Sequence, residues 1–270
     1  MSDSSAHERA ALRLIEAAES GVPCDPIVDL LPDGTVDDAY DVQQQVIAMT
    51  RAGGRDGGAA SARRVGRKIG LTSPVVQQMF GVDRPDFGVL FADMAIGDSE
   101  PVPRTRLMQP RVEAEVAFVL KSDLPERPVI ASDVMRATDF VVAAIEIVDS
   151  RIRDWNISIV DTVADNASSG MFVLGGALKR LRDVDVRSVE MSMTVDGGNV
   201  VSSGVGAACL GSPINAVVWL ANAVAERGAP LQAGEVILSG SLGPLVTVER
   251  GRTYEATITG LGSVRATFAP

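Results

Sequence analysis

The sequence has few of the side chains that most often carry catalysis or metal binding. It contains one histidine, His7, and two cysteines, Cys24 and Cys209, among 270 residues. Zinc sites use His and Cys ligands, and most serine or cysteine nucleophiles use a histidine base, so both kinds of site are nearly excluded. Any proton transfer must therefore fall to Lys, Asp, Glu, Tyr or water.

The sequence also lacks a basic excess and a long apolar run. Its net charge is −10 and it has no cluster of Lys and Arg, so neither nucleic acid nor an anionic membrane is an expected partner. We find no apolar run of about 18 residues that would predict a membrane span. The first 20 residues lack the basic and apolar pattern of a signal peptide. Two cysteines without a metal-binding spacing fit a reducing compartment, so we expect a cytoplasmic protein.

Helices are predicted at the N-terminus and short strands over the remainder. Residues 6–20 predict a helix that ends near Gly21, and a second helix follows Thr35 and stops before Gly53. A link rich in Gly, Ala and Ser covers 53–62. Short β-branched runs beyond it predict strands at 64–70, 112–120, 140–148, 171–175, 189–195, 235–239, 245–248, 254–259 and 264–268. Further helices are predicted at about 74–80, 131–138 and 213–227, the last capped by Ser212. We therefore predict a helical region over 1–60 and a sandwich or barrel domain over 61–270.

Three glutamates interrupt two of these apolar runs. Glu113 and Glu115 lie within 112–120, and Glu146 lies within 140–148. Side chains alternate between the faces of a strand, so Glu113 and Glu115 share a face. A buried carboxylate needs a positive partner, and an all-oxygen ligand set suits a hard dication such as Mg²⁺ or Mn²⁺. The alternative is a strand edge with solvated glutamates.

Lys68 and Asp86 are candidate catalytic residues. Lys68 lies between Gly66 and Gly70, and glycines let another group approach the backbone closely. A half-buried lysine there could bind a carboxylate or move protons, whereas the alternative is a surface lysine on an edge strand. Asp86 lies in a Pro-Asp-Phe-Gly segment, which is typical of a turn.

Two other segments are rich in short polar side chains. Residues 161–170 include Asn166 and Ser168, and Ser239 and Ser241 flank Gly240 after an apolar run. Turns and helix caps are the ordinary interpretation of such segments, and a polar cradle for a small acid is the alternative.

Taken together, these segments resemble the 2-keto-4-pentenoate hydratase (2-hydroxypenta-2,4-dienoate hydratase) family of the fumarylacetoacetate hydrolase superfamily. The similarity runs from about residue 36 to the C-terminus, although the 53–62 link is long and the residues after Trp155 lack lysines that some relatives carry. The matching segments are GRKIGLT at 66–72, GVDRPDFG at 81–88, QPRVEAE at 109–115, EIVDSRIRDW at 146–155, DTVADNASSG at 161–170, GEVILSGSL at 234–242 and GLGSV at 260–264.

The resemblance implies an α+β fold, a mixed β-sandwich or β-roll with an N-terminal helical region, in which 61–270 form the catalytic domain. It implies that a divalent cation, Mg²⁺ or Mn²⁺, is held by Glu113, Glu115 and Glu146. It also implies that Lys68 and Asp86 line the substrate site. The expected substrate-binding residues are Ser168 or its neighbour Asn166, together with Ser239 and Ser241. A homo-oligomer is expected as well.

The implied reaction is the metal-assisted addition of water to 2-hydroxypenta-2,4-dienoate, which gives 4-hydroxy-2-oxopentanoate in the meta-cleavage catabolism of aromatic compounds. A 4-oxalocrotonate-type decarboxylase would use the same metal site, and the segment GEVILSGS at 234–241 favours the hydratase. A carbon–carbon hydrolase commonly uses a histidine, which the core lacks. A non-catalytic partner subunit of the pathway is the remaining alternative, and the costly acidic cluster argues against it.

Overall fold

The computed structural model describes residues 5–51, 63–79, 81–126 and 128–270. The predicted domain boundary between 60 and 61, and the predicted link over 53–62, lie outside the described residues.

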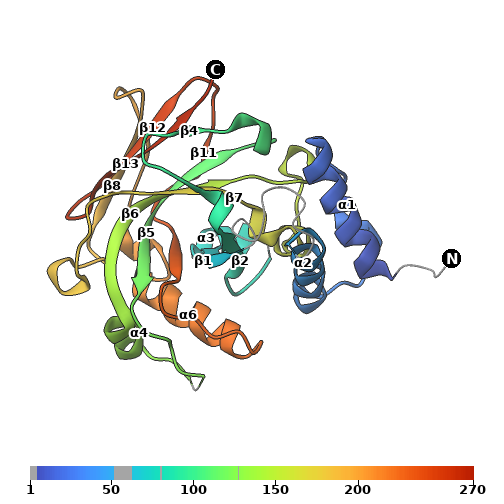
Figure 1. Ribbon diagram of the computed structural model, residues 1–270, viewed down its shortest axis with the longest axis horizontal. Coiled ribbons are helices and arrows are strands. Elements are labelled where there is room, and N and C mark those ends of the chain that lie inside the picture. The colour runs from blue at the N-terminus through green and yellow to red at the C-terminus, as the bar shows by residue number, and fades with distance from the viewer. Residues whose placement is uncertain (1–4, 52–62, 80, 127) are drawn as a thin grey trace.

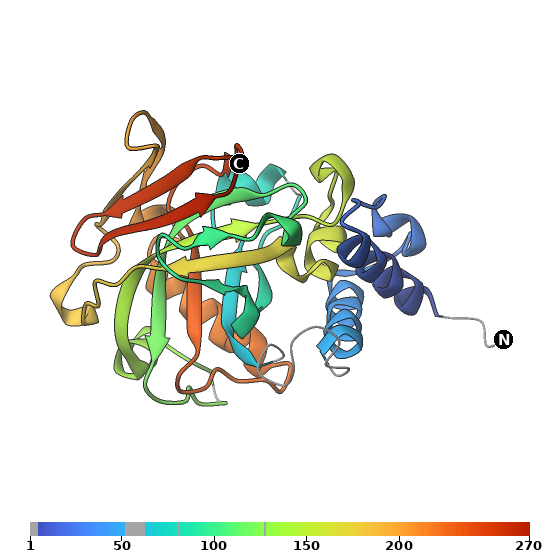
Figure 2. The same ribbon diagram turned by 45° about the horizontal axis from the view of Figure 1, so that its top comes forward.

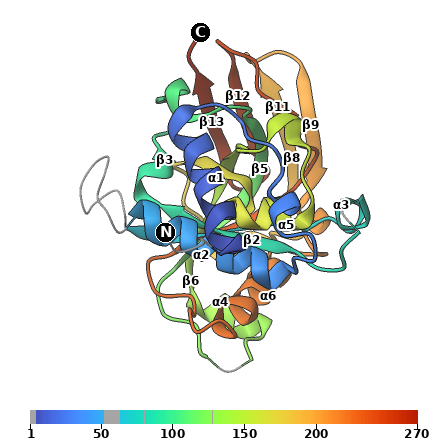
Figure 3. The same cartoon turned by 90° about the vertical axis from the view of Figure 1, so that its right-hand side faces the viewer.

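Two helices form the N-terminal region, as predicted. Helix α1 spans Ala6–Ser20 and ends at Gly21, whose φ of 68° is the left-handed conformation that glycine adopts without strain. Helix α2 spans Val36–Arg51. The two helices pack against each other, and α2 also packs on the short helix α5, Ile159–Ala164. Figures 1 and 3 show them at one side of the β-structure.

The larger sheet curls around the centre of the molecule (Figure 1). Its strand order is β2-β1-β10-β5-β6-β7-β3, and β11 adds to β5. The strands are mostly antiparallel, and β1 pairs with β10 in parallel. Their bounds are β1 Arg64–Gly70, β2 Asp86–Phe91, β3 Ala95–Ile96, β5 Arg111–Leu120, β6 Thr138–Val148, β7 Ser169–Leu174, β10 Val236–Ser241 and β11 Val246–Thr247.

A second sheet packs against one face of the first (Figure 2). Its order is β4-β13-β12-β8-β9, with β4 Pro101–Val102, β8 Glu190–Val195, β9 Val200–Val205, β12 Thr253–Ile258 and β13 Gly262–Phe268. Three further helices are α3 Pro74–Met79, α4 Ala131–Ala137 and α6 Pro213–Ala225. This arrangement confirms the predicted α+β fold with N-terminal helices.

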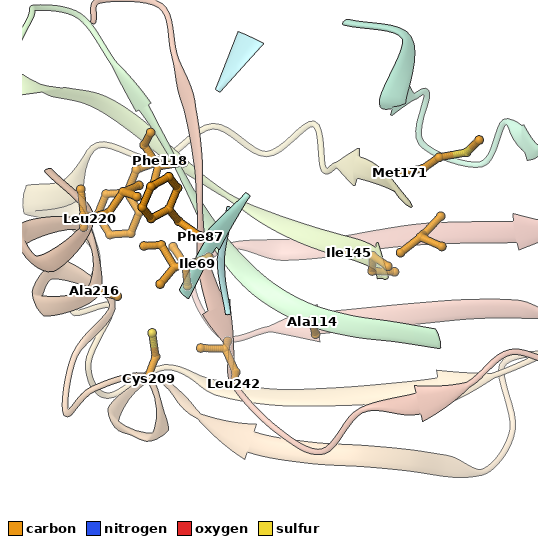
Figure 4. Close-up of a cluster of buried hydrophobic side chains, with 14 of the residues drawn as sticks. Ile69, Phe87, Ala114, Phe118, Ile145, Met171, Cys209, Ala216, Leu220 and Leu242 are labelled. Atoms are coloured by element: carbon orange, nitrogen blue, oxygen red, sulfur yellow. The ribbon is translucent and has the colours of Figure 1, made fainter. Parts of the chain in front are cut away.

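One face of β5 and β6 packs in the main hydrophobic core, and the side chains on that face are therefore uncharged. Residues Val112, Ala114, Val116 and Phe118 of β5 are buried in it, together with Ile145 of β6 and Leu220 of α6 (Figure 4). Because side chains alternate along a strand, the intervening residues of β5, Glu113 and Glu115, lie on the opposite face of the sheet. The predicted division of this strand into two faces is therefore confirmed.

Most predicted strands and helices are present, within a few residues at their ends. Strands β2, β3, β4 and β9 and helix α5 were not predicted. Asp86 is the first residue of β2, so the predicted turn is wrong: pairing of Asp86 with Gly70 of β1 overrides the local turn preference. Ser212 precedes α6, but its side chain makes no capping hydrogen bond, contrary to the prediction.

One stretch of the described chain, Gly206–Ala225, has the length and apolar composition of a membrane span, with a mean hydropathy of 1.4. The expectation that no such stretch exists is therefore wrong. Its helix α6 has only 13 residues, and Ala216, Val217 and Leu220 of α6 lie in the main core. A helix that is buried in a protein core is apolar for the same reason as one buried in lipid.

Candidate metal centre and active site

The pairing of β5 with β6 brings the three glutamates together. Glu113 lies directly opposite Glu146, and Glu115 lies two residues further along the same face of β5. One carboxylate oxygen from each residue lies within 4.8 Å of the other two. Glu115 and Glu146 are 0% and 1% exposed, so the alternative of a solvated strand edge is wrong for both.

Burial and mutual repulsion disfavour the charged forms of Glu113 and Glu115. Burial, followed by the charge of Glu146, raises the pKa of Glu113 to about 7 and raises that of Glu115 well above its usual value. The backbone N–H of Gly240 donates to Glu115 Oε2 at 2.7 Å. Among the described residues, Glu115 Oε1 and both oxygens of Glu146 receive no hydrogen bond. Buried carboxylate oxygens without donors are suitable ligands for a hard dication.

Lys68 extends from β1 toward this cluster. Its Nζ lies 3.1 Å from Glu146 Oε1, and its side chain is 4% exposed. Burial alone would lower the pKa of Lys68, but the charges of Glu146, Asp86, Glu113 and Glu115 outweigh it and raise the pKa. The alternative of a surface lysine is therefore wrong, and the amine stays protonated at neutral pH.

Asp86 and Lys68 meet above Gly70. Register places Gly70 opposite Asp86 and Lys68 opposite Gly88 on the neighbouring strands β1 and β2. A Cβ atom on Gly70 would lie 2.2 Å from Asp86 Oδ1 and 3.5 Å from Lys68 Nζ. The missing side chain therefore makes room for both groups, as the sequence suggested for the glycines around Lys68. Burial raises the pKa of Asp86 to about 6, so its carboxyl can exchange a proton near neutral pH.

Within the polar segment 161–170, residues Asn166–Ser168 form a tight turn between α5 and β7, and this turn lies beside β2. Asn166, Ala167 and Ser168 all have positive φ, between 52° and 53°, which is rare for residues other than glycine. The amide of Asn166 is bonded to the backbone N–H and carbonyl of Val89 at 2.8 and 2.9 Å. The hydroxyl of Ser168 is buried 3.2 Å from that of Thr162. The segment thus contains the predicted turn and also presents polar groups near the strand that carries Asp86.

The two serines after the apolar part of β10 differ in their environment. Ser239 is fully buried, and its hydroxyl has no hydrogen-bond partner among the described residues. Ser241 is paired with Glu115 across the sheet, and its hydroxyl donates to the carbonyl of Gly243 at 2.5 Å. The structure therefore places both serines on the strand whose Gly240 N–H contacts the acidic cluster.

A partly buried arginine, Arg151, donates hydrogen bonds to the polar turn, and sequence analysis did not identify it. Arg151 donates from Nη2 to the carbonyl of Asp165 at 2.7 Å and from Nη1 to that of Ser169 at 2.9 Å, and its Nε contacts the Asp165 carboxylate. Burial raises the pKa of Asp165 to about 6, and Arg151 opposes that rise. The only signal in the sequence was the charged segment 149–154 that directly follows an apolar strand.

Comparison with known proteins gives consistent similarities. Residues 60–269 match the fumarylacetoacetate (FAA) hydrolase C-terminal family. The chain is 52% identical over 268 residues to 2-keto-4-pentenoate hydratase from Burkholderia vietnamiensis, with 99% of each chain covered. It is 43% identical over 270 residues to 2-hydroxyhexa-2,4-dienoate hydratase from Comamonas testosteroni, also with 99% of each covered. A solved structure of 4-oxalocrotonate decarboxylase from Pseudomonas putida G7, complexed with magnesium and adipate, superposes with a TM-score of 0.88 at 34% identity and covers 97% of each chain.

Proposed function

The chain belongs to the fumarylacetoacetate hydrolase family, and from this membership we propose that it is a divalent-metal-dependent hydratase acting on 2-hydroxypenta-2,4-dienoate. The enzyme is a carbon–oxygen lyase of aromatic meta-cleavage catabolism, and its product is 4-hydroxy-2-oxopentanoate. The observation that carries the proposal is the placement of three carboxylates, two of them fully buried, and one buried lysine on the same face of the curled sheet. High identity to hydratases over the whole chain supports the same reaction.

We propose that Glu113, Glu115 and Glu146 hold the cation, as Mg²⁺ or Mn²⁺. The donor set is all oxygen, and Glu115 Oε1 and both oxygens of Glu146 accept no hydrogen bond among the described residues, which fits either ion. The related decarboxylase is a magnesium complex. When bound, the dication supplies Lewis-acid polarisation of a 2-oxo acid.

Lys68 would bind the substrate in its protonated, cationic form and would not act as a base. Its pKa is raised by the surrounding carboxylates, so it carries a proton and can donate a hydrogen bond to the substrate carboxylate or its 2-oxygen. In the first step the 2-hydroxyl loses its proton, and C5 gains one. The product of that step is the 2-oxo-3-enoate, and Lys68 stabilises the charge that develops on the 2-oxygen in a buried site.

Asp86 would move the protons of the second step. Water adds at C4 of the 2-oxo-3-enoate, and C3 receives a proton, so that one molecule of water is consumed per turnover. With a pKa of about 6, set by burial, Asp86 can accept a proton from water and return it. The position of Asp86 above Gly70 and beside Lys68 supports this role, because Lys68 is the proposed substrate-binding group.

We propose that Asn166, Ser168, Ser239 and Ser241 form the polar lining of the substrate site. Asn166 is hydrogen-bonded to Val89, and Ser241 is hydrogen-bonded to Gly243. These bonds would hold both side chains in fixed positions in the wall of the substrate site. Ser168 and Ser239 carry the hydroxyls that remain for a substrate oxygen.

The catalytic domain over 61–270, a homo-oligomeric assembly and a cytoplasmic location are further parts of this proposal, taken from the family resemblance.

Decarboxylation is the second candidate reaction, because the decarboxylase superposes over almost the whole chain. A non-catalytic partner subunit is disfavoured by the buried charges, which cost several kcal/mol if they serve no ligand. Identity is 52% to a hydratase and 34% to the decarboxylase, which favours hydration.

The deciding experiment follows the loss of dienol absorbance with added Mg²⁺ or Mn²⁺ and after chelation. Product mass separates the reactions, because hydration adds about 18 mass units and decarboxylation removes about 44 when a 2-oxo diacid is supplied. Glu146→Gln should abolish metal-dependent turnover. The matched variant Glu190→Gln, on an exposed strand position, should retain it. Metal-independent turnover, or turnover unchanged in Glu146→Gln, would reject the proposal.

A further inference from the structure

A second pocket lies on the reverse face of the strands that carry Lys68 and Asp86. Its volume is about 470 Å³, within the range of small-molecule sites. Its lining residues come from α2, β1, β2, the end of α6 and the residues that follow it, and Figure 3 shows α2, β2 and α6 close together. Arg67 and Phe87 line it, and each is the chain neighbour of a proposed catalytic residue on the opposite face.

Arg67 is a buried guanidinium that forms no ion pair with another residue in the described part of the chain. It is 3% exposed, and Nη2 donates to the carbonyl of Ala229 at 3.1 Å. Its Nε has no hydrogen-bond partner among the described residues, and none of their carboxylates forms an ion pair with it. Glu235, the acidic residue whose charge acts on Arg67, is paired with Arg64. An unpaired buried charge is costly, so a ligand that supplies the missing acceptor is favoured.

The walls of the pocket indicate the shape and charge of that ligand. Tyr40 and Phe87 are stacked, with ring centroids 4.4 Å apart, and they form an aromatic wall opposite Val224. Arg227 lies over the Tyr40 ring and is paired with Asp37. Asp37 and Asp41 stand on the exposed side of α2 at the rim. An acidic rim disfavours a multiply charged anion, whereas one carboxylate on an apolar body fits the cationic floor and aromatic wall.

We propose that this pocket binds a small aromatic or apolar monocarboxylate through Arg67, separately from the catalytic site. The carboxylate accepts hydrogen bonds from the Arg67 guanidinium, and its apolar body packs against Phe87 and Val224. The site does not require the metal, because no member of the acidic cluster lines it.

Calorimetric titration of the chelated full-length protein with benzoate tests the site. We expect saturable binding of one benzoate per chain, at least tenfold weaker in Arg67→Gln, because a charge-assisted pair is lost. Binding should be unchanged in Lys68→Met, which alters only the catalytic face. It should also be unchanged in Arg182→Gln, where the exposed guanidinium lies outside the pocket. Benzyl alcohol and inorganic phosphate should bind at least tenfold more weakly than benzoate.

Several outcomes would overturn the site. These are no saturable benzoate binding, equal binding by folded Arg67→Gln, loss of binding in Lys68→Met, or phosphate binding as tight as that of benzoate. If Arg67→Gln does not fold, Val224→Phe decides the question, because it narrows the pocket from α6 and leaves Arg67 in place. Unchanged benzoate affinity in folded Val224→Phe would then count against the proposal, and a loss would support it.

Discussion

The ammonium of Lys68 lies 3.1 Å from Glu146 Oε1, with both side chains almost fully buried. One ammonium cannot neutralise the four carboxyl groups of Glu113, Glu115, Glu146 and Asp86 that act on it. A bound dication would bring the cluster closer to neutrality and would leave Lys68 free to contact a substrate. This ion pair is therefore the point at which metal binding and substrate binding are coupled in the proposed enzyme.

Replacement of Lys68 tests its role separately from the metal site. Lys68→Met should lower kcat by about 10²- to 10³-fold, because the buried cation that stabilises the charge on the 2-oxygen is lost. Metal binding, measured by calorimetry, should persist because the three glutamates remain. Lys121→Met is the control, since Lys121 is exposed and bonds only through its backbone. Near-normal kcat in Lys68→Met would remove this residue from the mechanism.

Gly70 is predicted to be intolerant of even a methyl group. A Cβ there would lie 2.2 Å from Asp86 Oδ1, so Gly70→Ala must displace the carboxylate. We expect about a 10²-fold loss of turnover, as small misplacements of catalytic groups produce, with the circular dichroism spectrum preserved. Gly176→Ala is the matched control, because nothing lies within 4 Å of its Cβ position. Equal activity of the two variants would show that the position of Asp86 does not matter.

The metal-free protein should lose stability as the pH rises. The pKa of Glu113 increases on folding from 4.5 to about 7, so between these values the folded state binds more protons than the unfolded state. The free energy of unfolding therefore falls across this window and stays lower above it. Because a metal needs deprotonated ligands, Mg²⁺ should raise Tm more at about pH 8 than at about pH 5. Thermal melts with and without Mg²⁺ measure this, and a Mg²⁺ effect that grew toward acid pH would contradict it.

The hydrogen bonds of Arg151 should be worth more than those of an exposed arginine. Arg151→Met removes the guanidinium that donates to the buried Asp165 carboxylate and to the carbonyls of Asp165 and Ser169. We expect a loss of about 3–5 kcal/mol in the free energy of unfolding, measured by urea denaturation, and a higher KM because the turn containing Ser168 is loosened. Arg153→Met is the control, as Arg153 is exposed and its ion pair at 3.4 Å is on the surface. If Arg151→Met lowered the free energy of unfolding by less than about 1 kcal/mol, the turn would be stable without the Arg151 hydrogen bonds.

Local patterns were enough to identify the parts of the fold that depend on nearby residues. Alternation along 112–120 predicted which side chains of β5 face the core, and Gly21 predicted the end of α1. Strand β2 was not predicted, because Pro-Asp-Phe-Gly has the local chemistry of a turn and becomes a strand only through its pairing with β1. Helix α5 was hidden for a similar reason: its short polar residues also suit loops.

The sequence by itself predicted chemistry without histidine or cysteine, and it determined that Glu113 and Glu115 share a face, because composition and the alternation of a strand are local properties. Only the tertiary structure decided that Glu146 lies opposite Glu113, that Asp86 meets Lys68 above Gly70, and that Arg67 is buried without an ion-pair partner among the described residues. These relationships join residues distant in the chain. Register and sheet curvature fix them, and both result from packing of the whole core rather than from any local pattern.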